Sequence, residues 1–211
     1  MRCTGVILAG GEAARFDGQP KGLERVGGTR VIDRVALALA SASDSLLLVA
    51  NDPLADGWLP GVRTEPDVRT GAGALGGIHA ALVRAGTAVL VVAWDMPFVP
   101  GELLRLLRSI GEAGADVALP AGLSRRGVEP LSAYYSPACI APIERALDRG
   151  DRHIVSFFDD VRVATLPLET VARHGDPARL FMNVNTPSDL ALAERHASTP
   201  DAGDRRPEAP R

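Results

Sequence analysis

Short apolar runs that end in polar or glycine-rich turns alternate along this chain with longer stretches of helical period. That order of elements is typical of an α/β fold with a mostly parallel sheet. We therefore predict a three-layer α/β/α sandwich, in which helices cover both faces of a Rossmann-like sheet. The predicted strands are 5–8, 46–49, 88–93 and 117–119, and the predicted helices are 31–42, 77–85, 101–113, 137–149 and 187–196, with a further short helix at 151–158.

The length of 211 residues, with 46% hydrophobic side chains, suffices for one sizeable core and is too short for two large domains. We expect a single domain over residues 1–196. Its last helix is marked by Thr186 as the N-cap and Pro187 at the first helical position. Residues 197–211 hold three prolines and no large apolar side chain, so we expect a disordered tail there.

Charge and cysteine content narrow the classes of partner. A formal net charge of -3 argues against a nucleic-acid partner, although it is compatible with a small anionic ligand held by local contacts. Cys3 and Cys139 lie far apart and outside any metal-ligand spacing, which indicates reduced thiols in a cytoplasmic protein. No apolar run approaches the roughly 20 residues that a membrane span needs, so no membrane association is expected.

A glycine-rich loop follows the first predicted strand. Leu8, Ala9, Gly10 and Gly11 come directly after it, and Arg15, Gly18 and Lys21 follow before the first long helix. Ligands of open α/β sheets bind outside the carboxyl ends of the strands, and this loop can direct backbone N–H groups and two cations at a triphosphate. The G-K-[ST] arrangement of a P-loop is missing, so that class is disfavoured.

The apolar run 89–93 ends at Asp95, at the same edge of the predicted sheet. Mg²⁺ binds one or two carboxylates together with phosphate oxygens and waters, so we predict Asp95 as its ligand. The segment 71–76 matches G-x-G-x-x-G, with Asp95 about 20 residues further on, as in dinucleotide-binding proteins. No apolar strand precedes Gly71, so we interpret 71–76 as a flexible loop and disfavour a nicotinamide-dependent oxidoreductase.

Four motifs, in the same order along the chain, resemble those of molybdenum cofactor guanylyltransferases. They are the loop with Leu8–Gly11, Arg15, Gly18 and Lys21; residues 73–78 (GALGGI), which resemble G-P-L-x-G-[IM]; residues 94–98 (WDMPF), which resemble C-D-x-P-[FY]; and residues 181–187 (FMNVNTP), which resemble F-x-N-[IV]-N-T-P. The first motif is shared by many sugar-phosphate and cofactor nucleotidyltransferases, whereas the asparagine-rich ending points to the molybdenum cofactor branch.

The resemblance implies an enzyme that transfers GMP from GTP to molybdopterin or molybdenum cofactor with Mg²⁺ and releases pyrophosphate. It also implies transient contacts with proteins that deliver or accept the cofactor. By the same resemblance Arg15, Lys21 and Asp95 are the catalytic residues and Asp95 the metal ligand. The implied substrate-binding residues are Leu8, Ala9, Gly10, Gly11, Gly18, Lys21, Asn51, Asp67, Gly76, Arg152, Asn183 and Asn185.

Other interpretations stay open at this point. The nearest alternative is a transferase of the same fold that uses CTP or a sugar phosphate, and a further one is a nucleotide-binding domain without catalysis. Asn51 can be a turn residue, and Asn185 can cap the last helix. Two positions depart from the family pattern, because Ala74 replaces the usual proline and Trp94 the usual cysteine.

Overall fold

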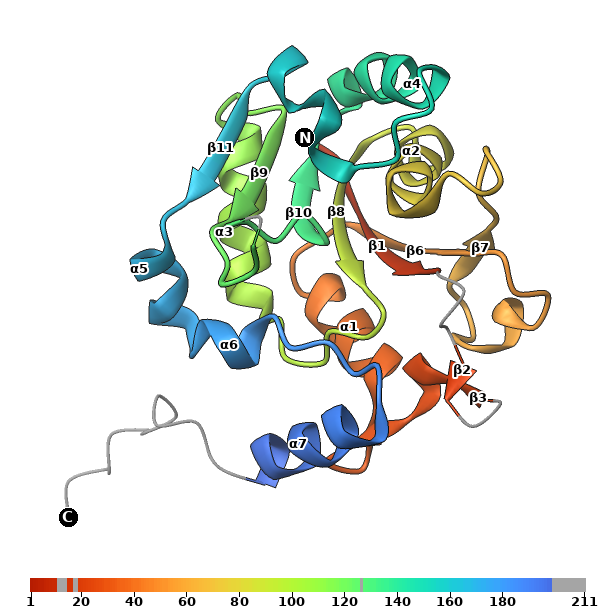
Figure 1. The fold of residues 1–211 in the computed structure, drawn as a ribbon, viewed down its shortest axis with the longest axis vertical. Helices are drawn as coiled ribbons and strands as arrows, with labels where there is room; N and C mark the ends of the chain where they lie inside the picture. Colours follow the sequence, from red (N-terminus) through yellow and green to blue (C-terminus); the bar gives the residue numbers. More distant parts are fainter. Residues whose placement is uncertain (11–14, 17–18, 126, 199–211) are drawn as a thin grey trace.

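A computed structural model describes residues 1–10, 15–16, 19–125 and 127–198. Within them, seven strands form one sheet in the order β11-β9-β10-β8-β1-β6-β7, in which only β10 pairs antiparallel with its neighbours. This mostly parallel sheet is the predicted one (Figure 1). Its strands are β1 (Cys3–Ala9), β6 (Ser45–Ala50), β7 (Arg63–Glu65), β8 (Ala88–Ala93), β9 (Val117–Pro120), β10 (Ser132–Tyr135) and β11 (Val163–Leu166).

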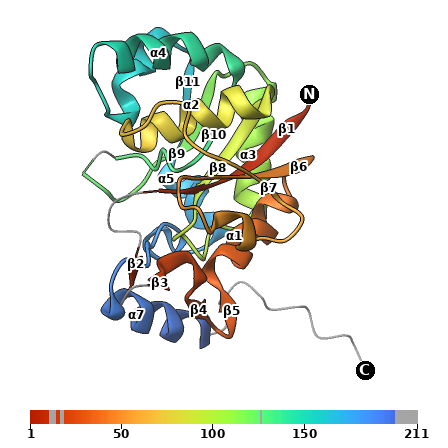
Figure 2. The same ribbon diagram turned by 90° about the vertical axis from the view of Figure 1, so that its right-hand side faces the viewer.

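Helices cover both faces of the sheet, as predicted. One face carries α1 (Val31–Ala40) and α3 (Gly101–Glu112), and the other carries α2 (Gly73–Ala85) and α4 (Ile140–Asp148). Figure 2 shows the sheet nearly edge-on between α2 and α4 above and α1 below. The remaining helices are α5 (Leu168–Val171), α6 (Pro177–Leu180) and α7 (Pro187–Ser198), together with the 3-10 helices η1 (Lys21–Leu23), η2 (Ala55–Gly57), η3 (Pro137–Cys139), η4 (Ile154–Asp160) and η5 (Ala172–His174).

The central strands are apolar on both faces because both faces are covered. In β8, Leu90 and Val92 pack in the cluster under α1 and α3, while Val89 and Val91 pack in the cluster under α2 and α4. In α3, Leu103, Leu104 and Leu107 form an apolar stripe and are fully buried. Cys3 and Cys139 are buried free thiols, and burial raises the pKa of each, to about 11 and about 12.

Three short strands of the central sheet were not predicted. These are β7, β10 and β11, each of only three or four residues. Two short antiparallel pairs, β2 (Arg15–Phe16) with β3 (Gln19–Pro20) and β4 (Arg25–Val26) with β5 (Thr29–Arg30), lie below the sheet in Figure 2, and β4 contacts α7. The predicted helix 137–149 is divided into η3 and α4, and the predicted helix 151–158 is the 3-10 helix η4.

Two segments that were predicted to be irregular are helical. Helix α2 begins at Gly73, four residues earlier than predicted, so Gly73–Gly76 are helical and do not form a flexible loop. Helix α7 continues to Ser198, so Ala197 and Ser198 are not part of a disordered tail, and Ala197 packs against a small cluster formed by Val26, Val31, Val184 and Ala193. Residues 199–211 lie outside the described residues. None of the described helices has the length and apolar character needed to cross a membrane.

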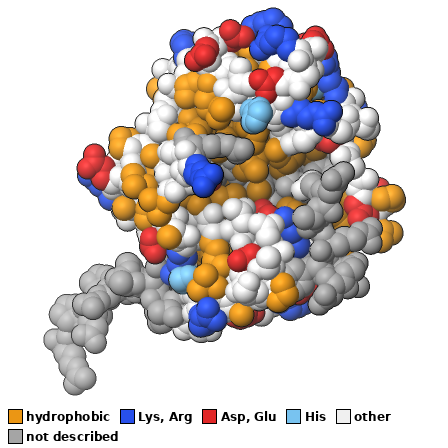
Figure 3. Space-filling model, in the orientation of Figure 1, with side chains coloured by type: hydrophobic (Ala, Val, Ile, Leu, Met, Phe, Trp, Pro, Cys, Tyr) orange, Lys and Arg blue, Asp and Glu red, His pale blue; other side chains and the backbone are white. Residues whose placement is uncertain are grey.

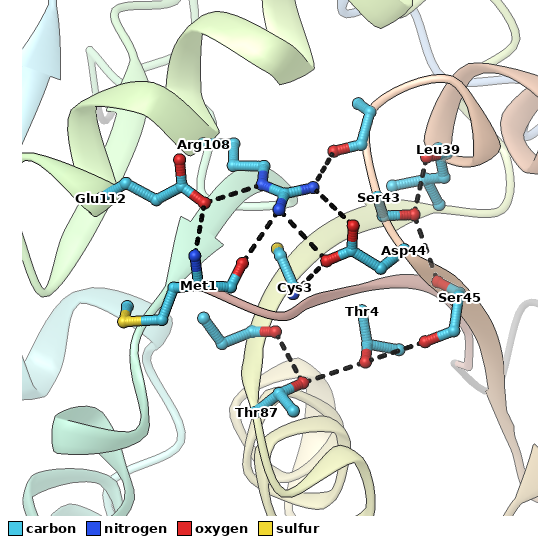
Figure 4. Close-up of polar contacts among 12 residues, drawn as sticks. Met1, Cys3, Thr4, Leu39, Ser43, Asp44, Ser45, Thr87, Arg108 and Glu112 are labelled. Carbon is cyan, nitrogen blue, oxygen red and sulfur yellow. Dashed lines mark hydrogen bonds and ion pairs between the residues drawn. The ribbon is translucent and has the colours of Figure 1, made fainter.

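Arg108 in α3 ties together the edge of the sheet where β1 begins. Its guanidinium donates to the Met1 carbonyl at 2.9 Å and the Ala42 carbonyl at 3.2 Å, and it pairs with Asp44 at 3.1 Å. Asp44 in turn accepts the Cys3 N–H at 2.8 Å (Figure 4). That N–H, followed by the Arg108 guanidinium, holds the pKa of Asp44 below its usual value. This edge lies opposite the carboxyl ends of the parallel strands.

Candidate active site

A cavity of about 750 Å³ opens at the carboxyl ends of the central parallel strands. Leu8 and Ala9 reach it from the end of β1, Val49 from β6 and Ala93 from β8, and the residues that follow these strands complete this wall. Parallel strands end at one edge of their sheet, which is where ligands of open α/β folds bind. The lining residues are Leu8, Ala9, Gly10, Pro20, Val49, Asn51, Asp52, Trp58, Asp67, Gly71, Gly73, Ala74, Gly77, Ala93, Trp94, Asp95, Leu131, Arg152 and Asn183.

The face of the molecule seen in Figure 3 is mixed in character. Apolar side chains gather below α4, and charged side chains of both signs lie over α4 itself. No extended surface of one charge is visible on this face, in keeping with the small net charge of the chain.

A buried ion pair lies at the edge of this cavity. Lys21, the first residue of η1, donates from Nζ to Oδ2 of Asp95 at 2.6 Å, and each residue is only 7% exposed. The same Nζ donates to Oδ1 of Asn185 at 2.5 Å. The ammonium therefore lies between two oxygens whose residues are 74 and 164 positions away from it in the chain.

The start of α7 places Asn185. Asp189 Oδ2 accepts the N–H groups of Asn185 and Thr186 at 3.1 and 2.9 Å, and Thr186 Oγ1 accepts the Asp189 N–H at 3.2 Å, which is a reciprocal cap. Burial acts to raise the pKa of Asp189, but these hydrogen bonds outweigh it and lower the pKa. One residue before Asn185, the Val184 N–H donates to the Asp95 carbonyl at 2.9 Å. Thr186 thus caps α7 as predicted, while the Asn185 side chain is directed to Lys21.

On the opposite wall, Asn51 follows β6 and Asp67 follows β7. The Asn51 amide donates to Oδ2 of Asp67 at 2.8 Å, and the Asp67 N–H donates to Oδ1 of Asn51 at 2.9 Å. Asn51 is exposed, Asp67 is half-buried, and both line the cavity. The pair thus fixes the orientation of an amide and a carboxylate side by side.

Two glycines near the start of α2 make contacts that leave no room for a side chain, one with the sheet and one with the residue that precedes the helix. A Cβ at Gly77 would lie 2.4 Å from Leu8 Cδ1, and a Cβ at Gly76 would lie 2.4 Å from the Ala72 Cβ. These contacts require glycine for close approach rather than for an unusual φ angle. Gly76 and Gly77 therefore serve tight packing at the start of the helix, whereas Gly71 and Gly73 have positive φ angles of 69° and 63°.

Most of the predicted site residues meet at this cavity. The lining residues include Leu8, Ala9, Gly10, Asn51, Asp67, Asp95, Arg152 and Asn183. Lys21 contacts Asp95 at the cavity edge, and Asn185 contacts Lys21. Gly76 is buried in the first turn of α2 and does not line it, whereas its neighbours Gly73, Ala74 and Gly77 do. Gly11 and Gly18 lie outside the described residues, and of Arg15 only the backbone, in β2, is described.

Sequence reasoning missed two aromatic residues of the site. Trp58, which follows η2, and Trp94, which follows β8, both line the cavity and stack with ring centroids 5.1 Å apart and planes 19° apart. Nothing near Trp58 in the sequence pointed to a site. Trp94 was noted only as a departure from the family pattern, and its place directly before Asp95 is the signal that could have identified it.

The oxygen donors of the site suit a hard cation. Among the described residues no group of three or more His, Cys, Asp or Glu side chains converges on one point, so a metal cage built from protein alone is not found there. Asp95 and Asn185 instead offer one carboxylate and one amide oxygen on either side of the Lys21 ammonium. That donor set matches Mg²⁺, which completes its shell with phosphate oxygens and waters.

Comparison with known proteins shows which family this chain resembles. The model of the "MobA-like NTP transferase domain" family matches residues 5–164. A "Probable molybdenum cofactor guanylyltransferase" of Pelotomaculum thermopropionicum is 40% identical over 96% of this chain and 97% of its own length, and the "Molybdenum cofactor guanylyltransferase" of Desulfosudis oleivorans is 38% identical over 90% and 94%. The crystal structure of molybdopterin-guanine dinucleotide biosynthesis protein A from Archaeoglobus fulgidus superposes with a TM-score of 0.77 at 30% identity, covering 92% of this chain and 98% of that one.

Proposed function

This chain belongs to the molybdenum cofactor guanylyltransferases, whose common unit is the MobA-like NTP transferase domain, and from that premise we propose that it transfers GMP from GTP to molybdopterin or molybdenum cofactor and releases pyrophosphate. The chain is thus a nucleotidyltransferase, and the proposal concerns its nucleotide, its acceptor and the roles of its residues.

One observation carries the proposal: a lysine and an aspartate meet, both buried, beside a cavity at the carboxyl edge of the sheet. A buried ion pair is costly to desolvate and is weak evidence for stability by itself. Beside a cavity, however, it supplies an ammonium for phosphate oxygens and a carboxylate for a cation, which are the two charges that nucleotidyl transfer needs.

The nucleotide would lie along the ends of β1 and β6. Backbone groups of Leu8, Ala9, Gly10, Gly11 and Gly18 would hold it with Lys21 and Arg15 at the phosphates, and Asn51 and Asp67 would contact guanosine. In support, Leu8, Ala9 and Gly10 line the cavity, and a Cβ at Gly10 would meet no atom of the described residues within 4 Å. The Asn51–Asp67 pair presents a fixed amide and carboxylate to whatever lies in front of it.

Asp95 would hold Mg²⁺, with Asn185 and Asn183 on the side of the metal or the pterin. When bound, the cation would neutralise phosphate charge and so favour departure of pyrophosphate. The Lys21 ammonium contacts Oδ2 of the Asp95 carboxylate that would hold the cation. Lys21 would therefore turn toward phosphate oxygens when the nucleotide and its cation bind.

The reaction needs no covalent intermediate on the protein. An oxygen of the terminal phosphate of molybdopterin would attack the α-phosphorus of GTP, the bond from that phosphorus to the bridging oxygen of the β-phosphate would break, and pyrophosphate would leave with the bonding electron pair. The part of the protein is to orient the two phosphates and to oppose the charge that develops on the leaving group. Lys21 and Arg15 would do this for the pyrophosphate, and Arg152, which lines the cavity, would face the acceptor.

The decisive experiment is pyrophosphate release from GTP, CTP, ATP and UTP, each with Mg²⁺ and with molybdopterin or its molybdenum form. Release with GTP alone, together with a guanine dinucleotide product, supports the proposal. Release with one other nucleotide alone would show that this chain has the nucleotide specificity of a related transferase of the same fold. No release with any of them would refute the proposed catalytic activity.

A further inference from the structure

Trp94 stands between the last residue of β8 and Asp95, at a position where the motif it resembles has cysteine. Its side chain is 2% exposed, lines the cavity and stacks on Trp58. The indole Nε1 finds no hydrogen-bond partner among the described contacts. The ring therefore contributes through its shape and its position rather than through a hydrogen bond inside the protein.

The six-membered ring of Trp94 lies against the backbone of Gly22. A Cβ at Gly22 would be 2.3 Å from Trp94 Cε3, 2.8 Å from Cδ2 and 3.0 Å from Cζ3. Because those atoms belong to a fused ring held in the core, they cannot yield as the end of a flexible side chain would. Gly22 is thus required by the presence of the indole.

This contact lies one residue away from the buried ion pair on both sides. Gly22 follows Lys21 in η1, and Trp94 precedes Asp95, whose carboxylate accepts from Lys21. The end of β8 is fixed independently, since the Trp94 N–H donates to the Leu8 carbonyl at 3.2 Å and the Asp95 carbonyl accepts the Val184 N–H. The distance between η1 and the end of β8 is set by the Trp94 indole, which packs between them.

We propose that Trp94 is a positioning residue that acts through Gly22: its ring sets the distance at which η1 presents Lys21 to Asp95 and to the bound triphosphate. This inference rests on the proposed function for its catalytic readout, but the packing that it describes does not depend on the acceptor or on the base. It predicts that residues 22 and 94 behave as one unit, so that a change at one position alters the effect of a change at the other.

The test is a double-mutant cycle of Gly22→Ala, Trp94→Cys and the combined variant. Gly22→Ala should lower kcat at least about 10-fold while Trp94 is present, since the added methyl displaces Lys21, and by less than about 2-fold when the Trp94→Cys substitution has removed the ring. Trp94→Phe keeps an aromatic ring and loses no described hydrogen bond, so it should stay within about 3-fold of the unmodified protein. An equal effect of Gly22→Ala in both backgrounds would overturn the proposal.

Two controls separate positioning from general destabilisation. Gly57 in η2 is also in a 3-10 helix, and a Cβ there would meet no atom within 4 Å in the part of the chain that the structure describes, so Gly57→Ala should change neither kcat nor the melting temperature. In a Lys21→Ala background, Gly22→Ala should cause no further loss of kcat, because the group that it misplaces is gone. A further loss of the same size would show that the contact acts only on the stability of the fold.

The inference can fail separately from the proposed function. If no nucleotide supports pyrophosphate release, the same cycle is measured as the dissociation constant for GTP with Mg²⁺ by calorimetry. Coupling between positions 22 and 94 in that constant supports the positioning role, whereas independent effects contradict it.

Discussion

Asn51 and Asp67 hold each other by two reciprocal hydrogen bonds of 2.8 and 2.9 Å across the mouth of the cavity. Asn51→Ala removes both hydrogen bonds, whereas Asp67→Ala leaves the bond from the Asp67 backbone N–H to Asn51 Oδ1. We expect each substitution to weaken GTP binding about 10-fold and the double variant to be little worse than Asn51→Ala. Calorimetric titration with GTP checks this. Additive losses would mean that the two residues contact the nucleotide independently.

Substitutions at Asp95 and at Lys21 should impair the reaction in different ways. Asp95→Asn keeps an oxygen that can accept from Lys21 but removes the charge for a cation, so metal-dependent turnover should fall about 100-fold or more. The melting temperature should fall as well, because the buried Lys21 ammonium loses its counter-charge. Lys21→Ala deletes a charge-assisted contact with the triphosphate and should cost at least about 10-fold in binding or in transfer. Steady-state kinetics over a range of Mg²⁺ concentrations distinguishes the metal-dependent defect of Asp95→Asn from the binding defect of Lys21→Ala. Unchanged turnover in Asp95→Asn would refute the assignment of Asp95 as the metal ligand.

Thr186 is expected to affect both stability and the site. Thr186→Ala removes the acceptor for the Asp189 N–H, and loss of such a cap costs about 1 kcal/mol in the free energy of unfolding. Since the same cap orients Asn185, kcat should fall as well, whereas Thr186→Ser should restore both quantities. Urea unfolding and kinetics of the two variants measure this, and a kinetic defect that serine does not repair would contradict the argument.

Asp116 should contribute an acid-sensitive part of the stability. Hydrogen bonds from Arg162 hold its pKa at about 2 against a usual value of 3.8, although burial opposes this, so its stabilising effect is complete above about pH 4 and is lost as the pH falls toward 2. Arg162 is 74% exposed, so solvent screening keeps the effect small. The difference in unfolding free energy between the unmodified protein and Asp116→Asn should shrink across that range, and a constant difference would refute the assignment.

The layers of the fold could be predicted from the sequence because buried parallel strands are continuous apolar runs, as in β8. The edge strand β7 was not, since Arg63–Glu65 is polar and only three residues long and is recognised only by its pairing with β6. The start of α2 was misjudged for a related reason. Glycine lowers helix propensity, and only the close approach of Gly76 and Gly77 to their neighbours explains why helix forms there.

In the site, Asp95 could be predicted because it follows a strand, and Asn183 and Asn185 because they resemble a family motif. The convergence of Lys21, Asp95 and Asn185 on one another could not be derived from the residues alone, because segments 74 and 164 positions apart meet only in the folded chain. No sequence pattern around Trp58 indicated a site, and its place in the cavity wall, stacked on Trp94, is known only from the structure.

The stacked indoles have a practical consequence. Trp58 and Trp94 are the two tryptophans of the chain, and both line the cavity, so all of its tryptophan fluorescence originates at the wall where we expect the nucleotide. The emission of the unlabelled protein therefore reports directly on occupancy of that cavity.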